Sequence, residues 1–347
     1  MTLLLLAAFS SAAEFTEVPE AMSVLGGLEY RTTQGTGRLL EAGVPISDRQ
    51  LRRHDLSLSG AFSPATGIAI TIDATFTPSL QLSYPGSRSM IIEPLAGSGS
   101  YLSGEPLDET PVVSASGLAG VWLGGAVVPF SEHYERAQRT SWRIEAAVRT
   151  PSARRNLWTA PRGTRGVAPG GAAVRTSAAF STDRGNAAPW LRVAYQHELP
   201  VVVDVTDEAG LTWVTGLSLR PASSLALDSG LELAVVRGDA SRPGLRLNAS
   251  LGGEYRTWED VATGVYLPNV LDGGRAIPVT VGDSLAGRAE LGVLVAIRPT
   301  VRARTGLGIV YRTPYRVEHV YPVTTSADSW QLDWTVRFEG VTSLSKG

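Results

Sequence analysis

Apolar and polar side chains alternate in a segment near the C-terminus. From Trp330 to Phe338 every second residue is apolar. The residues between them are polar or charged: Gln331, Asp333, Thr335 and Arg337. A period of two is typical of a β-strand with one apolar and one polar face. Such a strand fits the wall of a transmembrane β-barrel, where lipid contacts one face and a wet interior contacts the other.

The same alternation recurs along most of the chain and predicts an all-β fold. Thirteen segments carry it: 22–31, 55–62, 68–76, 116–130, 142–149, 171–182, 186–198, 211–219, 225–233, 245–255, 291–297, 301–311 and 330–338. The segments 55–62 and 68–76 flank the turn residues Pro64 to Gly67 and predict a hairpin. The alternation is weakest in 116–130, where glycine and apolar residues occupy both parities.

The number of strands is the open point of this prediction. Bacterial barrels made from one chain close with an even number of strands, which thirteen segments do not satisfy. The segment 78–93, with Leu80, Leu82 and Tyr84, supplies a fourteenth strand. We therefore predict a transmembrane antiparallel up-and-down β-barrel of 14 strands, with 12 strands as the alternative.

The lengths of the connections predict which end of the barrel faces which compartment. Short turns at 63–67, 182–186 and 298–300 are expected at the periplasmic end. Longer connections rich in Gly, Pro, Ser and Asp are expected outside the cell: 94–115, 150–170, 258–284 and 313–326. Between residues 220 and 244 two short connections follow each other, which this alternation of ends does not accommodate.

The N-terminus resembles a secretory signal. Leu3 to Ala8 form an apolar run, and Ser11, Ala12 and Ala13 offer small residues before Glu14. We expect a signal peptide over residues 1–13, followed by one transmembrane barrel domain over residues 14–347.

Composition removes several other classes of protein. No apolar run approaches the roughly 18 residues that a membrane-spanning helix needs. The formal net charge of −2 gives no electrostatic support for a nucleic-acid partner. There is no cysteine, so disulfides, thiol catalysis and zinc–thiolate sites are excluded.

Taken with the aromatic C-terminal strand, these features make the chain similar to Gram-negative outer-membrane β-barrel proteins. Aromatic girdles at the two lipid–water interfaces would come from Trp142, Trp213, Tyr255, Tyr311, Trp330, Trp334, Phe62 and Phe76. Phe338 matches the aromatic residue on which such chains ordinarily finish, although Glu339 to Gly347 follow it. The resemblance implies a place in the cell outer membrane. It also implies outer-membrane lipid, the barrel assembly machinery and other envelope proteins as partners.

Two narrower families invite comparison. Outer-membrane fatty-acid transporters have fourteen strands and an N-terminal hatch. This chain has Thr16 to Ala21 at that place and only about ten residues before the first predicted strand, too few for a plug. General porins have sixteen strands and a constriction in which acidic residues face arginines.

The inward parity of the predicted strands carries the candidate functional residues. These lumen-facing charges are Arg143, Glu145, Arg149, Arg288, Glu290, Arg302, Arg304, Asp333 and Arg337. One interpretation is an aqueous channel with a transverse field at its constriction. The other is a closed interior filled with salt bridges. Arg302 and Arg304 form either a cationic patch or ion pairs with Glu290 and Asp333.

Catalysis and cofactor chemistry find little support. The chain has 4 histidines, and His133, which follows Ser131 and Glu132, lacks the spacing of a nucleophile and its base. Asp204, Asp207 and Glu208 are ordinary solvated loop carboxylates rather than a calcium site. The glycine-rich stretch 166–171 lacks the lysine of a phosphate-binding loop. We expect no enzyme, no metal and no cofactor.

Three functions remain open. The first is a pore or passive transporter for small hydrophilic solutes. The second is a structural or assembly barrel within an envelope complex. The third is a transporter of hydrophobic ligands, for which Pro200, unable to donate to a strand ladder, would be one place to look for a lateral opening.

Overall fold

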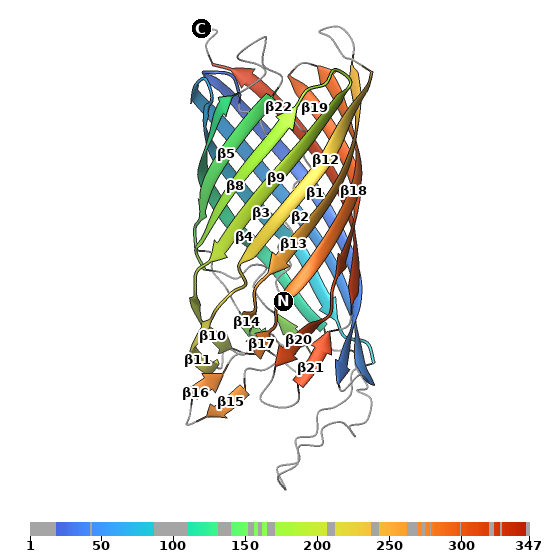
Figure 1. Cartoon of the computed structure of the whole chain (residues 1–347). Helices are drawn as coiled ribbons and strands as arrows, with labels where there is room; N and C mark the ends of the chain where they lie inside the picture. Colours follow the sequence, from blue (N-terminus) through green and yellow to red (C-terminus); the bar gives the residue numbers. More distant parts are fainter. Residues whose placement is uncertain are drawn as a thin grey trace.

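The structure is a closed antiparallel β-barrel (Figure 1). The computed structural model describes residues 19–41, 44–86, 110, 112–130, 140–151, 156–158, 162–164, 171–206, 212–236, 243–261, 269–272, 275–277, 279–298, 300–318, 323–326 and 328–344. No helix long and apolar enough to cross a membrane occurs in these ranges. The predicted signal peptide, residues 1–13, lies outside them.

The barrel wall has 12 strands. In chain order they are β1 (Ser23–Glu41), β2 (Val44–Ala65), β3 (Ile68–Ser83), β4 (Val112–Phe130), β5 (Thr140–Arg149), β8 (Ala173–Thr182), β9 (Ala187–Glu198), β12 (Ser224–Val236), β13 (Gly244–Arg256), β18 (Ser284–Arg298), β19 (Val301–Arg312) and β22 (Ser329–Ser343). Each strand pairs with the next, and β22 pairs with β1 from Ser23↔Ser343 to Thr36↔Trp330. The wall therefore has no free edge.

The two ends of the barrel differ in their connections. The beginning of β1, the end of β22 and the turns after β2, β8 and β18 share the end at the top of Figure 1. Short strands gather at the other end: β6 (Asn156–Trp158), β7 (Arg162–Thr164), β10 (Val201–Thr206), β11 (Thr212–Leu219), β14 (Glu259–Val261), β15 (Asn269–Asp272), β16 (Arg275–Ile277), β17 (Val279–Val281), β20 (Tyr315–Glu318) and β21 (Val323–Ser326). The predicted short turns and long connections thus lie at opposite ends, so the end with the short strands is the extracellular one.

The expected count of 14 strands is wrong, and the alternative of 12 is right. The segment 211–219 is not in the wall, because β11 pairs with β10 beyond the end of β9, while β9 pairs directly with β12. The segment expected as a fourteenth strand begins inside β3, which continues to Ser83. Removing β11 from the wall also explains the two short connections in succession between residues 220 and 244.

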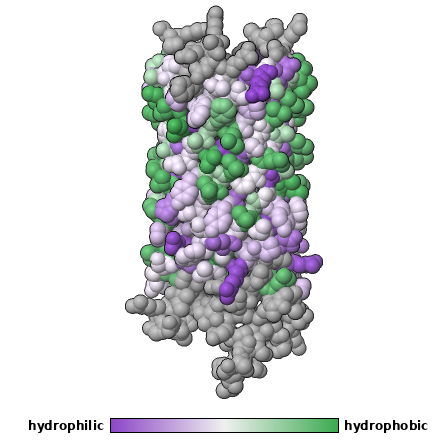
Figure 2. All heavy atoms as spheres, viewed as in Figure 1, coloured by the Kyte–Doolittle hydropathy of each residue, from purple (hydrophilic) through white to green (hydrophobic). Residues whose placement is uncertain are grey.

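The two faces of the wall meet different surroundings, as the alternation predicts. Apolar side chains point outward and are among the most exposed of their type: Leu291 is 69% exposed and Leu307 56%. Figure 2 shows apolar side chains over the upper and middle part of the near face, with hydrophilic side chains gathering toward the extracellular end. Trp142 lies outward near the periplasmic end, whereas Tyr255 and Trp330 lie outward near the extracellular end. An apolar outer band bordered by aromatic residues is the surface that a bilayer covers.

Candidate functional site

Charged side chains fill much of the barrel interior, and they constitute the candidate site. All nine predicted residues belong to strands of the wall. Arg149, Glu290, Arg304 and Asp333 are buried, and the others are partly buried or bonded to a partner in the interior. We call these residues and the charges that pair with them the charged layer.

The first group joins strands that are not neighbours in the wall. The Arg175 guanidinium of β8 lies 3.2 Å from Glu145 of β5 and 3.3 Å from Asp73 of β3. Arg143 pairs with the same Glu145 at 2.7 Å. Arg175 also lies over the ring of Trp122 on β4, 4.8 Å from its centroid, which is a cation–π geometry. Because β4 and β5 separate β3 from β8 in the wall, the Asp73–Arg175 contact crosses part of the interior rather than following the sheet.

The second group lies on β12, β18 and β19. Arg288 donates a hydrogen bond to the carboxylate of Asp228. Arg304 lies 3.9 Å from Glu290, and both side chains are almost fully buried. Of the two pairings that the sequence offered for Arg302 and Arg304, the Arg304–Glu290 contact is therefore present. Arg302 lies opposite Glu339 in the β19–β22 pairing.

The third group lies where the last strand meets the first. Arg337 of β22 lies 2.8 Å from Glu339 and 3.8 Å from Glu29 of β1. Glu29 in turn pairs with Arg31 at 2.9 Å. Arg31 also interacts electrostatically with Asp333 and with Glu290, which belongs to the second group. Ion pairs between arginines and glutamates thus accompany the closure of the barrel where β22 meets β1.

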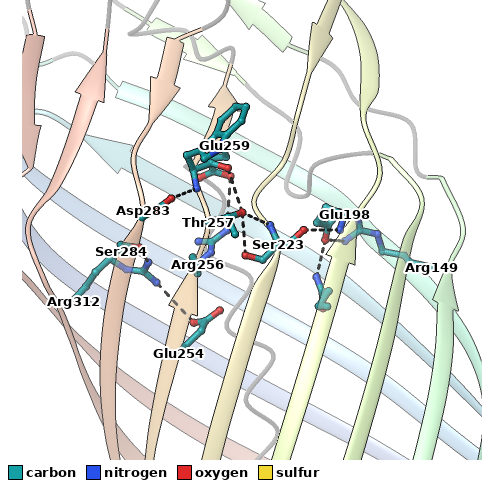
Figure 3. Close-up of polar contacts among 12 residues, drawn as sticks. Arg149, Glu198, Ser223, Glu254, Arg256, Thr257, Glu259, Asp283, Ser284 and Arg312 are labelled. Atoms are coloured by element: carbon teal, nitrogen blue, oxygen red, sulfur yellow. Dashed lines mark hydrogen bonds and ion pairs between the residues drawn. The ribbon is translucent and has the colours of Figure 1, made fainter.

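A further set of polar contacts lies at the extracellular mouth (Figure 3). Arg149 at the end of β5 makes two hydrogen bonds to Glu198 at the end of β9, at 3.1 and 2.5 Å, and both side chains are buried. On the other side of the view, Arg312 donates to the Ser284 hydroxyl at 2.7 Å and lies 4.0 Å from Glu254. Two hydrogen bonds to one carboxylate fix its orientation, so the strand ends are held at the level where the extracellular connections begin.

Glycines in the wall make room for large interior side chains. A Cβ on Gly120 would meet the Arg149 side chain at 2.6 Å, and the φ of Gly120 is +136°, which L side chains rarely adopt. A Cβ on Gly230 would lie 2.6 Å from the indole of Trp190. Glycine at these places lets an arginine and a tryptophan lie flat against the inside of the wall.

Access of water to the charged layer is uneven. Most of its members are nearly closed off, with side-chain exposures of 0% for Arg149, 5% for Glu290 and 6% for Arg304. Asp73 differs, with a side-chain exposure of 35%. A wide water-filled pore would leave the whole ring of charges exposed, so the interior in this structure is constricted. Among the paired carboxylates described in the charged layer, Asp73 beside Arg175 is the most accessible to water.

The sequence missed several buried charges of the interior. Glu29, Arg31, Arg53 and Glu198 were absent from the predicted set, yet all are buried in the interior. Arg53 pairs with Asp55 at 2.6 Å. The signal for Glu29 and Arg31 was present, because Leu28 and Tyr30 already placed the even positions of that strand outward.

His133 and three loop carboxylates were the candidates for catalysis and for calcium binding. His133, with Ser131 and Glu132, lies outside the described residues, as do Asp207 and Glu208. Asp204 is exposed and accepts a hydrogen bond from the Gly216 amide at 2.8 Å. Within the described ranges no group of three or more histidines or carboxylates is placed to hold a metal ion.

Comparison with known proteins gives the class of the fold. An outer-membrane channel from Pseudomonas putida F1 has a TM-score of 0.55 and 10% identity, over 96% of this chain and 100% of that one. The translocator domain of the autotransporter NalP from Neisseria meningitidis has a TM-score of 0.44 and 10% identity, over 92% and 89%. A Pseudomonas aeruginosa FadL homologue has a TM-score of 0.41 and 8% identity, over 92% and 90%. No protein-family model matches the chain, and neither does the sequence of any curated protein.

The closed wall, the apolar outer band and the likeness to the Pseudomonas putida channel together define the class. The protein is a transmembrane β-barrel of the Gram-negative outer-membrane type. At 10% identity the likeness establishes the fold, and the function has to be argued from the interior.

Proposed function

We propose that the protein is an outer-membrane channel for small polar solutes, with the charged layer as its constriction. The support comes from the interior surface, which is lined by charged and hydroxyl side chains over most of its height. Opposite charges that face each other across a lumen produce a transverse field, which orients dipolar solutes. Along the described strands the interior offers no continuous apolar path, so a hydrophobic ligand would gain nothing from entering it.

The Asp73–Arg175 contact is the observation on which the proposal depends most. It reaches from β3 to β8 at 3.3 Å and includes the most water-exposed carboxylate among the paired residues of the layer. A small solute passing through the barrel would meet this pair where water already reaches it. The pair would therefore set both the width of the passage and its preference for charge.

Planar-bilayer recording of the purified protein tests the proposal. We expect small, stable conductance steps for the natural chain. Arg175→Ala should increase the conductance and shift selectivity toward cations, because Asp73 and Glu145 then face the lumen without that arginine. The fold should survive the substitution, since Glu145 keeps Arg143 at 2.7 Å and Asp73 is reached by water. Arg38→Gln is the matched control, because Arg38 pairs with Asp48 in an exposed position on the wall.

A closed scaffold within an envelope complex is the second candidate. The burial of Arg149, Glu290 and Arg304 favours it, because a filled interior serves rigidity as well as transport. If neither the natural chain nor Arg175→Ala conducts ions in the bilayer, the channel proposal is overturned and the scaffold is supported. A heat-modifiability gel must show in the same preparations that both proteins are folded.

A further inference from the structure

The outer wall carries a groove that the channel proposal does not use. It has a volume of about 330 Å³ and lies across β19, β22, β1 and β2. Its outward side chains are Ile309, Trp330, Leu332, Gln34, Thr36, Gln50 and Arg52. One part of the groove is thus apolar and the other part polar and cationic.

The strand pairing orders these residues along the membrane normal. Ile309 pairs with Leu332, Leu332 with Gln34, and Gln34 with Arg52, so the four form one row across the wall. On the near face of Figure 1, β5 to β18 follow one another from left to right and each strand rises to the right. A row at right angles to such strands descends toward the later strand, which is toward the extracellular end. Arg52 is therefore the outermost of the four, and Ile309 the deepest.

The apolar end of the row belongs to the lipid-covered band. Ile309 is 45% exposed and Leu332 54% exposed on the outer face, continuous with Leu307 and Trp334. The row then passes to exposed polar residues on β1 and β2. The groove consequently crosses the border between the hydrocarbon and the headgroups of the outer leaflet.

Arg52 has the charge and the freedom to bind an anion at that border. Its side chain is exposed, and its cross-strand neighbours are the amides Gln34 and Gln81. Within the described part of the chain it makes no ion pair, whereas Arg38, four residues beyond Gln34 on β1 toward the extracellular end, is paired with Asp48 at 2.9 Å. A guanidinium flanked by amide donors is suited to a phosphate and the sugar hydroxyls beside it.

We propose that this groove binds a phosphorylated glycolipid of the outer leaflet. One acyl chain would lie along Ile309 and Leu332, and a phosphate would accept hydrogen bonds from Arg52, with Gln34 and Gln50 reaching the sugar. Apolar contact fixes the depth of the lipid, and the charge-assisted hydrogen bonds select the phosphate. The extracellular position of Arg52 is the reason for choosing the glycolipid of that leaflet over a phospholipid of the inner one.

Native mass spectrometry of the whole folded chain in detergent tests this proposal. The probe is bisphosphorylated lipid A, titrated against the natural chain, Arg52→Gln and the matched variant Arg38→Gln. We expect Arg52→Gln to bind about tenfold more weakly, the loss of one charge-assisted hydrogen-bond set. Arg38→Gln should bind like the natural chain, because its guanidinium is already engaged by Asp48.

Two further lipids, dephosphorylated lipid A and phosphatidylglycerol, are compared with the bisphosphorylated form. Lipid A from which the phosphates have been removed should bind the natural chain about as weakly as the phosphorylated form binds Arg52→Gln. Equal affinity of the natural chain and Arg52→Gln, or of the two forms of lipid A, would overturn the proposal. Phosphatidylglycerol bound as tightly as lipid A, with the same dependence on Arg52, would overturn the choice of glycolipid. None of these results depends on whether the barrel conducts.

Discussion

A charge placed on the outer face of β19 gives a sharp test of the assigned faces. Leu307 is 56% exposed on the outer wall and pairs with Leu291 and Trp334. It follows Val301, the first residue of β19, by six positions. With a rise of about 3.3 Å per residue and a tilt of about 40°, Leu307 lies about 15 Å from the periplasmic turn. This is close to the middle of an apolar band about 25 Å tall.

Leu307→Arg should therefore lower the free energy of unfolding by about 2–4 kcal/mol, the cost of an arginine near the bilayer midplane. Gln50→Arg is the matched control, because Gln50 is an exposed outward residue on β2 at the extracellular end. There the same substitution should cost only about 0–1 kcal/mol.

The assay is reversible urea unfolding in lipid vesicles, followed by tryptophan emission and by heat-modifiability gels. Both variants and the natural chain are compared at the same lipid ratio. Equal losses for Leu307→Arg and Gln50→Arg, or no loss for Leu307→Arg, would refute the assignment of this face to the membrane interior.

Three further predictions concern the wall and its interior. A double substitution of Val193 and Leu227 to cysteine should give a disulfide-linked barrel, because these residues pair across β9 and β12 and the chain has no other cysteine. A failure to cross-link in folded protein would mean that β11, rather than β12, is the neighbour of β9 in the wall. Arg149→Met should destabilise the barrel by about 3–5 kcal/mol in the same urea assay, because it leaves the buried Glu198 carboxylate without that partner. A change below about 1 kcal/mol would mean that water already hydrates the carboxylate. Gly230→Ala should cost about 1–3 kcal/mol and shift tryptophan emission, because its Cβ would meet an indole at 2.6 Å; an unchanged spectrum and stability would place that ring elsewhere.

The faces of the strands were predictable from sequence, and the number of strands was not. A period of two reports that the two sides of a strand have different surroundings, which holds for lipid and lumen in Leu307 and Arg304. The same period occurs in β11, where Leu217 and Leu219 are 2% and 0% exposed at the extracellular end. Alternation alone does not distinguish a strand of the wall from a hairpin packed at the mouth. The pairing partner decides this, and partners come from the whole chain.

The composition of the charged layer was likewise only partly predictable. Inward charges were found wherever the alternation was strong, as for Arg143 and Glu145. Their connections depend on the curvature of the wall, which brings Arg175 to Asp73 across two intervening strands. Glu198 follows the same inward parity as Arg192 on β9, yet its bond to Arg149 needs the register of three strands. The degree of closure of the lumen depends on all these side chains at once.

Solid-state NMR of the unmodified chain in bilayers tests the central claim most directly. Proton magnetisation is transferred to the protein once from lipid acyl chains and once from water, and its arrival along β22 is compared. We predict rapid transfer from acyl chains to Leu332, Trp334 and Phe338, and slow transfer from both sources to Asp333 and Thr335, which are 6% and 2% exposed inside the barrel. Rapid transfer from water to Asp333 and Thr335 would contradict the constriction of the interior at their level, and contact of these two residues with acyl chains would contradict the barrel itself.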